Sequence, residues 1–128
     1  MKKRFLSIIM AAIMILSLIP ISAIAYTGKG TSSEPYVVSS AEDFSSALSA
    51  GSGTIYVNLG ISFSGDLTIT NGKNVVLDLN GKTLTNSSGH TITVQSGATL
   101  TITGSGTVDN GTHAKAAIFN DAGGTVTL

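Results

Sequence analysis

Apolar and polar residues alternate along the chain after Gly53, in short runs that are separated by Asn, Gly and Ser. Alternation with a period of two predicts β-strands that bury one face and expose the other to water. One series of runs returns at intervals of about 24 residues, at Thr54–Leu59, Val75–Leu79, Thr99–Thr103 and Thr125–Leu128. A regular repeat of this size is typical of stacked architectures, in which each repeat contacts its neighbours.

Two further series of runs follow with nearly the same period, and the three series always come in the same order. The second series consists of Ile61–Phe63, Thr83–Thr85 and Thr107–Asp109. The third consists of Leu67–Thr70, Thr91–Val94 and Ala117–Phe119. A chain that visits three faces in rotation, and advances by one strand in each circuit, is a three-sided parallel β-solenoid. We therefore predict an all-β fold, a parallel β-helix of about three coils, for residues 54–128.

The intervals between equivalent apolar residues are nearly constant: 22 residues from Ile55 to Leu77, 23 from Ile61 to Leu84, and 23 from Ile69 to Ile92. Amides recur at two corners in the same way, at Asn86 and Asn110 after the second series and at Asn71, Gln95 and Asn120 after the third. These amides suit a hydrogen-bonded ladder that runs up the stack, although Asn also tolerates left-handed turn conformations without such a ladder.

An antiparallel sandwich is the alternative fold, because short strands with Gly-rich turns suit it as well. Asn71–Gly72, Asn80–Gly81 and Asn110–Gly111 each have the composition of a hairpin turn. A sandwich does not require a constant repeat in three separate series of strands. The spacing therefore favours the solenoid.

The segment before Gly53 has a different periodicity. Three apolar residues share one face of a helix: Phe44, Ala47 and Leu48. We predict a short amphipathic helix at Ser40–Ala50, with Ser39 as its N-cap and Glu42 completing a capping box. Pro35–Val38 is a candidate for a short strand that precedes this helix.

The first 25 residues have the features of a secretory signal peptide. Met1–Arg4 is cationic, Phe5–Ile19 is uncharged and almost wholly apolar, and Ala23–Ala25 supplies the small residues of a cleavage site. A membrane anchor is the alternative, because the apolar run is long enough to span a bilayer, but Pro20 and the Ala-x-Ala pattern favour cleavage after Ala25. The predicted organisation is a signal peptide at 1–25, a lead-in strand and capping helix at 26–53, and coils at 54–128.

Removal of the signal peptide changes the charge balance of the chain. The whole chain has no formal net charge, whereas residues 26–128 contain four lysines, no arginine and seven acids. Binding of nucleic acid requires clustered basic residues, so we expect no nucleic-acid partner. The chain contains no cysteine, which excludes disulfides and cysteine-ligated metals. We expect no cofactor.

Three stretches of the chain resemble the N-terminal portion of right-handed parallel β-helix proteins of the pectin-lyase-like superfamily. They are Gly53–Val57, Asn74–Thr85 and Gly97–Asn110, and the likeness extends over about Pro35–Leu128. It is greatest to large secreted or cell-wall proteins of Gram-positive bacteria. The resemblance implies a right-handed coil whose open end is capped by the helix at Ser40–Ala50. Such proteins have many more coils, so we expect a chain that is truncated at its C-terminus.

The resemblance implies two groups of enzymes, lyases and hydrolases, that cleave acidic polysaccharides. The lyases use Ca²⁺-binding acids with a basic residue, often arginine, and residues 26–128 contain no arginine. The hydrolases use clustered aspartates that lie within about 5–10 Å of each other. Asp78 has no acidic neighbour on adjacent coils, and Asp109 stacks over Thr85. We therefore predict no catalytic residue in this segment, and expect both aspartates to serve solubility on a wet face.

Two histidines are the remaining candidates for metal ligands. His90 and His113 are 23 residues apart and fall on neighbouring corners of the predicted coils. A metal site requires at least a third ligand, and the sequence offers none at these corners. We predict exposed loop histidines and no metal site.

Threonines of the third series suggest a binding surface. Thr68 and Thr70, followed by Thr91 and Thr93 one coil later, would point outward as a flat array similar to the surface of ice-binding solenoids. Phe119 interrupts that array in the next coil. The strand propensity of threonine explains these residues without a ligand.

The sequence as a whole predicts a secreted or cell-surface β-helix segment with a structural, adhesin-like or carbohydrate-contacting role and no catalytic activity of its own. The expected partners are polysaccharide or the cell-wall surface, together with further β-helix coils, and no membrane after cleavage of the signal. The alternative is the N-terminal part of a polysaccharide lyase or glycoside hydrolase whose active site lies downstream of Leu128.

Overall fold

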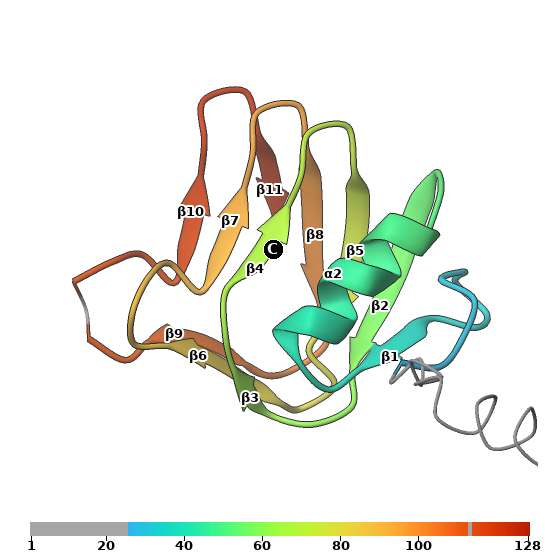
Figure 1. Ribbon diagram of the computed structural model, residues 1–128, viewed down its shortest axis with the longest axis horizontal. Helices are drawn as coiled ribbons and strands as arrows, with labels where there is room; N and C mark the ends of the chain where they lie inside the picture. The colour runs from blue at the N-terminus through green and yellow to red at the C-terminus, as the bar shows by residue number, and fades with distance from the viewer. Residues whose placement is uncertain (1–25, 113) are drawn as a thin grey trace, which may run out of the picture.

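The strands of the protein lie in three parallel sheets, which are accompanied by one helix within the described residues (Figure 1). The structure is a computed structural model, and it describes residues 26–112 and 114–128. The predicted signal peptide lies outside these ranges. No helix within them is long and apolar enough to cross a membrane.

Sheet A, the largest of the three, has five strands in the order β1-β2-β5-β8-β11. Its strands are β1 (Tyr36–Val38), β2 (Thr54–Leu59), β5 (Asn74–Asp78), β8 (Thr99–Thr103) and β11 (Thr125–Thr127). From β2 onward the chain leaves sheet A after each strand, passes through the two smaller sheets, and returns to the neighbouring position in sheet A. The predicted rotation through three series of strands is therefore confirmed in its order.

The two smaller sheets have three strands each. Sheet B contains β3 (Phe63–Ser64), β6 (Thr83–Asn86) and β9 (Thr107–Asn110). Sheet C contains β4 (Leu67–Ile69), β7 (Ile92–Val94) and β10 (Ile118–Asn120). Every pair of neighbouring strands in the three sheets is parallel. The antiparallel sandwich is therefore wrong, and the arrangement is compatible with a parallel β-helix.

The strand register departs by two residues, at several places, from the intervals between equivalent apolar residues. The observed pairs are Ile55 with Val75, Phe63 with Leu84, and Ile69 with Val94. Alternation fixes which face of a strand is buried but does not fix which apolar residues stand opposite each other. A slip of two residues leaves every side chain on its predicted face, whereas a slip of one would reverse all of them. The predicted faces of these strands are consequently correct.

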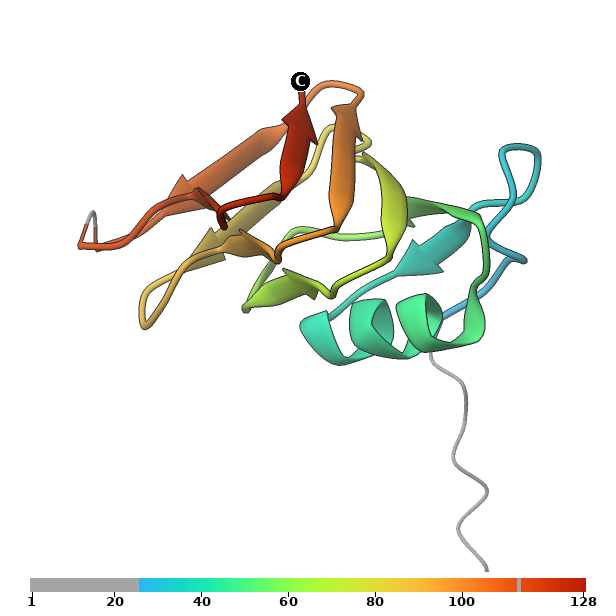
Figure 2. The same cartoon turned by 90° about the horizontal axis from the view of Figure 1, so that it is seen from above.

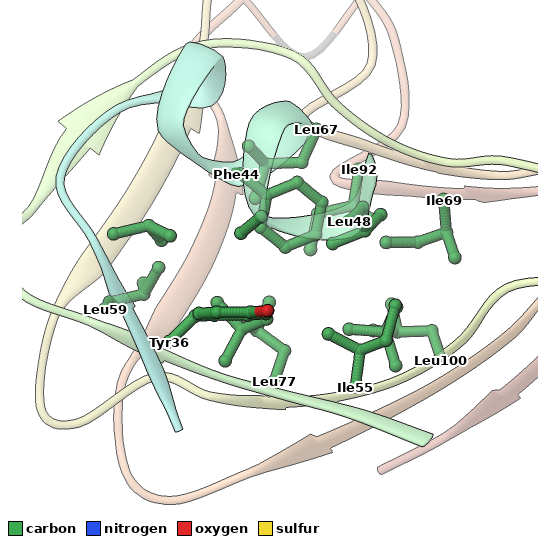
Figure 3. Packing of buried hydrophobic residues seen from close by; sticks show 14 of the residues in the cluster. Tyr36, Phe44, Leu48, Ile55, Leu59, Leu67, Ile69, Leu77, Ile92 and Leu100 are labelled. Atoms are coloured by element: carbon green, nitrogen blue, oxygen red, sulfur yellow. The ribbon is translucent and has the colours of Figure 1, made fainter. Parts of the chain in front are cut away.

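The buried faces of the sheets enclose a column of aliphatic side chains (Figure 3). Leu77 of β5, Leu67 of β4 and Leu84 of β6 are each 0% exposed, so all three sheets contribute to it. Toward the last strands the column is less covered, since Ile102 of β8 and Val126 of β11 are only partly buried. The core is therefore best formed between the helix and the middle strands.

The helix α2 (Ala41–Ala50) begins one residue later than the predicted cap implies. Ser40, not Ser39, is the N-cap, and its side-chain oxygen accepts a hydrogen bond from the Asp43 main-chain N–H at 3.1 Å. The Asp43 carboxylate in turn accepts one from the Ser39 N–H at 3.1 Å. The arrangement is a variant of the capping box, in which Asp43, and not Glu42, accepts the N–H of the residue before the cap.

The apolar face of α2 packs against β1 and β4, which are the first strands of sheets A and C (Figures 1 and 2). Phe44 is 1% exposed and Leu48 is 4% exposed. Both side chains point into the space between the sheets, near Leu67 and Ile92 (Figure 3). The helix thereby covers the end of the apolar column that lies opposite β9, β10 and β11 (Figure 2).

We expect that replacing Ser40 with alanine lowers the free energy of unfolding by about 1 kcal/mol. The substitution leaves the Asp43 N–H at the first turn without its side-chain acceptor. Chemical denaturation followed by far-UV circular dichroism measures the change. Ser45→Ala is the matched control, because Ser45 is exposed within the same helix; equal losses in the two variants would contradict the assignment of the cap.

The Asn80–Gly81 turn has hairpin geometry but does not connect a hairpin. Asn80 and Gly81 both have positive φ, at 50° and 73°, and the Lys82 N–H donates to the Leu79 carbonyl at 2.8 Å. The Asp78 carboxylate accepts the Asn80 N–H at 2.8 Å, which fixes the entry to the turn. The strands on the two sides are β5 of sheet A and β6 of sheet B, so the turn redirects the chain from one sheet to the next.

The corner amides of Asn86 and Asn110 stand in register, as the spacing predicts, but they do not form a ladder. Both side chains are buried, at 5% and 3% exposed. The Asn86 amide donates to the His90 carbonyl at 2.8 Å, and the Asn110 amide donates to the Gly89 carbonyl at 2.6 Å. Main-chain carbonyls of the loop between β6 and β7 therefore take the place of the amide partners, which satisfies buried polar groups where the chain turns.

Candidate functional site

The outer face of sheet C carries an exposed aromatic residue, Phe119, which stands in register with side chains of the other two strands. Thr68 of β4, Thr93 of β7 and Phe119 of β10 are neighbours in the strand register. Phe119 is 41% exposed. Because neighbouring strands lie about 4.8 Å apart, the three side chains form a row in which two hydroxyls lead to one apolar ring.

The His90 ring extends this row at its aromatic end. It stacks on the Phe119 ring with centroids 4.4 Å apart and planes inclined by 16°. Its Nδ1 accepts a hydrogen bond from the Ala116 main-chain N–H at 3.0 Å. His90 is half-buried, and not a freely exposed loop histidine as the sequence suggested. We call Thr68, Thr93, Phe119 and His90 together the sheet C surface.

A shallow hollow adjoins the other end of the sheet C surface. It lies between α2 and β4 and has a volume of about 60 Å³. Its lining side chains come from the helix, from β4 and from the turn that follows: Ser45, Leu48, Ser49, Thr68, Thr70 and Lys73. Since Thr68 belongs to both, the hollow and the sheet C surface form one continuous polar strip that contains a single cation, Lys73, and one exposed aromatic ring among its described residues.

The predicted threonine array is only partly present. Thr68 and Thr93 do stand side by side on the outer face. Thr91, in contrast, is 0% exposed and points inward, where its hydroxyl donates to the Asp109 carbonyl at 2.6 Å. It precedes β7 at a corner, and the need of its own buried hydroxyl for a partner outweighs the strand alternation there. A flat array of four outward threonines does not exist.

Three aspartates of the structure have local partners that explain their positions. Asp43 belongs to the helix cap, Asp78 holds the Asn80 turn, and Asp121 accepts the neighbouring Ala122 N–H at 3.0 Å. In the part of the chain that the structure describes, no group of three metal-ligating side chains is present. Asp78 therefore has a structural role beyond the solubility that the sequence suggested.

The predicted relation between the two histidines is not tested, because His113 lies outside the described residues. His90 has its Nδ1 occupied by the Ala116 N–H and its ring face occupied by Phe119. A metal at Nδ1 would have to displace that hydrogen bond. The arrangement around His90 therefore favours a role in positioning the adjacent loop.

Comparison with known proteins adds no relative to this picture. No family model, no curated protein and no solved structure matches the chain. The likeness to the pectin-lyase-like superfamily therefore rests on the sequence resemblance alone. The parallel sheets are consistent with a β-helix-like solenoid.

Sequence reasoning treated Phe119 as a defect in a threonine array and did not connect it with His90. The two residues are 29 positions apart, which is not a multiple of the repeat. The register of the third series of strands is the sequence feature that could have predicted that the two residues lie close together. It places Phe119 beside Thr93, and His90 lies in the corner that leads into that same strand.

Proposed function

We propose that this chain is a secreted or cell-surface scaffold of the pectin-lyase-like type, in which the parallel sheets close into a three-sided, right-handed β-helix. The parallel register and the fixed rotation of strands through sheets A, B and C support this architecture. The packing of α2 against the first strands supports a capping role for the helix. In this segment the scaffold has no catalytic activity of its own and contacts polysaccharide.

The exposed ring of Phe119 on the sheet C surface is the observation that carries the polysaccharide contact. A ring that is 41% exposed and stands in register with two threonines offers an apolar platform beside hydroxyl groups. A sugar ring presents the complementary combination, with apolar C–H groups on one face and hydroxyls at its edge. Binding sites of this kind join aromatic side chains to a few placed polar groups. The low charge of the strip favours stacking and hydrogen bonding over ion pairing as the mode of contact.

We expect that replacing Phe119 with alanine weakens binding of the chain to a polysaccharide about tenfold, which corresponds to about 1.4 kcal/mol. The physical reason is the loss of stacking area and of the dispersion contacts that an aromatic ring makes. Affinity electrophoresis through gels that contain pectin, xylan or β-glucan measures the retardation of each variant.

Ile61→Ala is the matched control for this experiment. Ile61 is 52% exposed but belongs to none of the sheets, so its removal should leave retardation unchanged. Retardation that is absent with every polysaccharide, or equal for both variants, would contradict the proposed contact. Release of new reducing ends or unsaturated products during incubation would contradict the absence of catalysis.

A further inference from the structure

His90 makes a contact whose direction depends on its protonation state. Its Nδ1 accepts the Ala116 main-chain N–H at 3.0 Å, across 26 residues of sequence. Ala116 belongs to the loop that joins β9 to β10, and this loop lies beside the corner that leads into β7 (Figure 1). The contact therefore ties the loop of one circuit to the corner of the circuit before it.

Two main-chain hydrogen bonds also hold the loop, at Ala116 and at Ala117. The Thr91 N–H donates to the Ala116 carbonyl at 3.2 Å, and the Ile92 N–H donates to the Ala117 carbonyl at 2.9 Å. These two bonds continue the ladder of sheet C into the loop and involve no titratable group. Of the bonds around Ala116, only the one to His90 can respond to pH.

A ring nitrogen of histidine accepts a hydrogen bond only while it carries no proton. A neutral imidazole with its proton on Nε2 matches the observed geometry, because Nδ1 then presents its lone pair to the Ala116 N–H. Protonation turns Nδ1 into a donor, so that two N–H groups face each other at a distance of 3.0 Å. Histidine is the side chain that gains its proton within the range of about pH 5–8.

The stacking of His90 on Phe119 responds in the opposite direction. A cation over the face of an aromatic ring is attracted by the ring quadrupole. The parallel stack at 4.4 Å is therefore retained or strengthened when the imidazole becomes an imidazolium. The protonated ring stays on Phe119, and the loop at Ala116 is the part that has to move.

The charged side chains around this contact do not replace the lost hydrogen bond. Asp66 lies beside Gly89, Lys115 directly precedes Ala116, and Asp109 lies on the outer face of β9. Within the described residues the one ion pair joins Lys29 to Glu34, so no carboxylate is paired with His90. His113, the remaining titratable residue of the loop, lies outside the described residues and is tested by substitution below.

We propose that His90 is a pH-sensitive contact, which holds the β9–β10 loop at Ala116 while neutral and releases it when protonated. The release is local, because the bonds from Thr91 and Ile92 persist.

Amide NMR of the full chain between pH 8 and pH 4.5 tests this inference. The Ala116 amide proton should shift with the same midpoint as the ring protons of His90. Its protection from hydrogen exchange, after correction for the intrinsic rate at each pH, should fall by about fivefold, as for the loss of one main-chain hydrogen bond. The Ile92 amide is the internal reference, since its acceptor is a main-chain carbonyl.

Three substitutions decide the interpretation. His90→Phe retains a ring for the stack but has no acceptor, so Ala116 should be unprotected at every pH. His90→Gln keeps an uncharged polar side chain and should remove the pH dependence at Ala116. His113→Ala should leave the response intact. A response that survives in His90→Phe, or an Ala116 amide that does not follow the His90 titration in the unaltered chain, would overturn the inference.

Discussion

Replacing Leu77 with alanine is expected to lower the free energy of unfolding by about 2–5 kcal/mol. Leu77 is 0% exposed and belongs to β5, the middle strand of sheet A. In the register it stands between Val57 of β2 and Ile102 of β8. Truncation leaves a cavity that strands paired on both sides are poorly able to close, which adds to the lost transfer free energy. Urea denaturation followed by circular dichroism measures the change.

Val76→Ala provides a control in the same strand. Val76 points to the outer face and is half-buried, between Tyr56 and Thr101 in the register. Its truncation creates no internal cavity, so the expected loss is about 1 kcal/mol or less. A loss at Val76 that equals or exceeds the loss at Leu77 would show that the inward and outward faces of β5 are assigned the wrong way round.

The contrast between these two neighbours explains why so much of the fold could be predicted. The alternation of Val75, Val76 and Leu77 with the surrounding polar residues is imperfect, yet the recurrence of the pattern from coil to coil assigns Val75 and Leu77 to the core. Burial of an apolar side chain stabilises the fold by about 1.5–3 kcal/mol. A slip of one residue in the strand register would expose all of the buried side chains of a strand, and the summed loss of burial energy excludes it. The order of the strands and the identity of the buried face follow from this burial free energy alone.

The register could not be predicted from the same pattern, because apolar residues two positions apart are chemically equivalent. Ile55 faces Val75 and not Leu77, since the path from β2 to β5 is shorter than the path from β5 to β8. The lengths of the corners decide this, and corners such as Gly60–Ser62 contain few residues whose conformation is prescribed by sequence. The consequence is visible at Ile61, which is 52% exposed and precedes β3, although the spacing placed it in a strand of the second series.

The candidate surface depends on the corners even more strongly. Thr91 points inward, where its hydroxyl donates to the Asp109 carbonyl, and His90 lies on Phe119 with its Nδ1 bonded to the Ala116 N–H. Each of these positions is decided by one hydrogen bond between segments that are distant in sequence. Such bonds contribute about 1 kcal/mol each, which is too little to produce a periodic signal. The scaffold is therefore predictable from the chain, whereas the side chains that distinguish its outer face become evident only in the structure.

Replacing Phe44 with alanine is the second change for which we expect a large effect, a loss of about 3–5 kcal/mol in the free energy of unfolding. Phe44 is 1% exposed and is the largest fully buried side chain of the described residues. It joins α2 to the column near Leu67 and Ile92 (Figure 3). A helix of 10 residues is marginal in isolation, so α2 depends on this packing and should detach when the ring is removed.

Detachment of α2 has a consequence beyond the loss of stability, because the helix covers the ends of sheets A and C at β1 and β4. Uncovered edge strands and an open apolar column favour association between molecules. Phe44→Ala should therefore sediment as larger species at concentrations at which the unaltered chain does not, in analytical ultracentrifugation at increasing protein concentration. Ser46→Ala, an exposed position of the same helix, should change stability by less than about 0.5 kcal/mol and leave sedimentation unaltered. If Phe44→Ala lost stability without any change in sedimentation, α2 would contribute to the core but would not protect the strand edges beneath it.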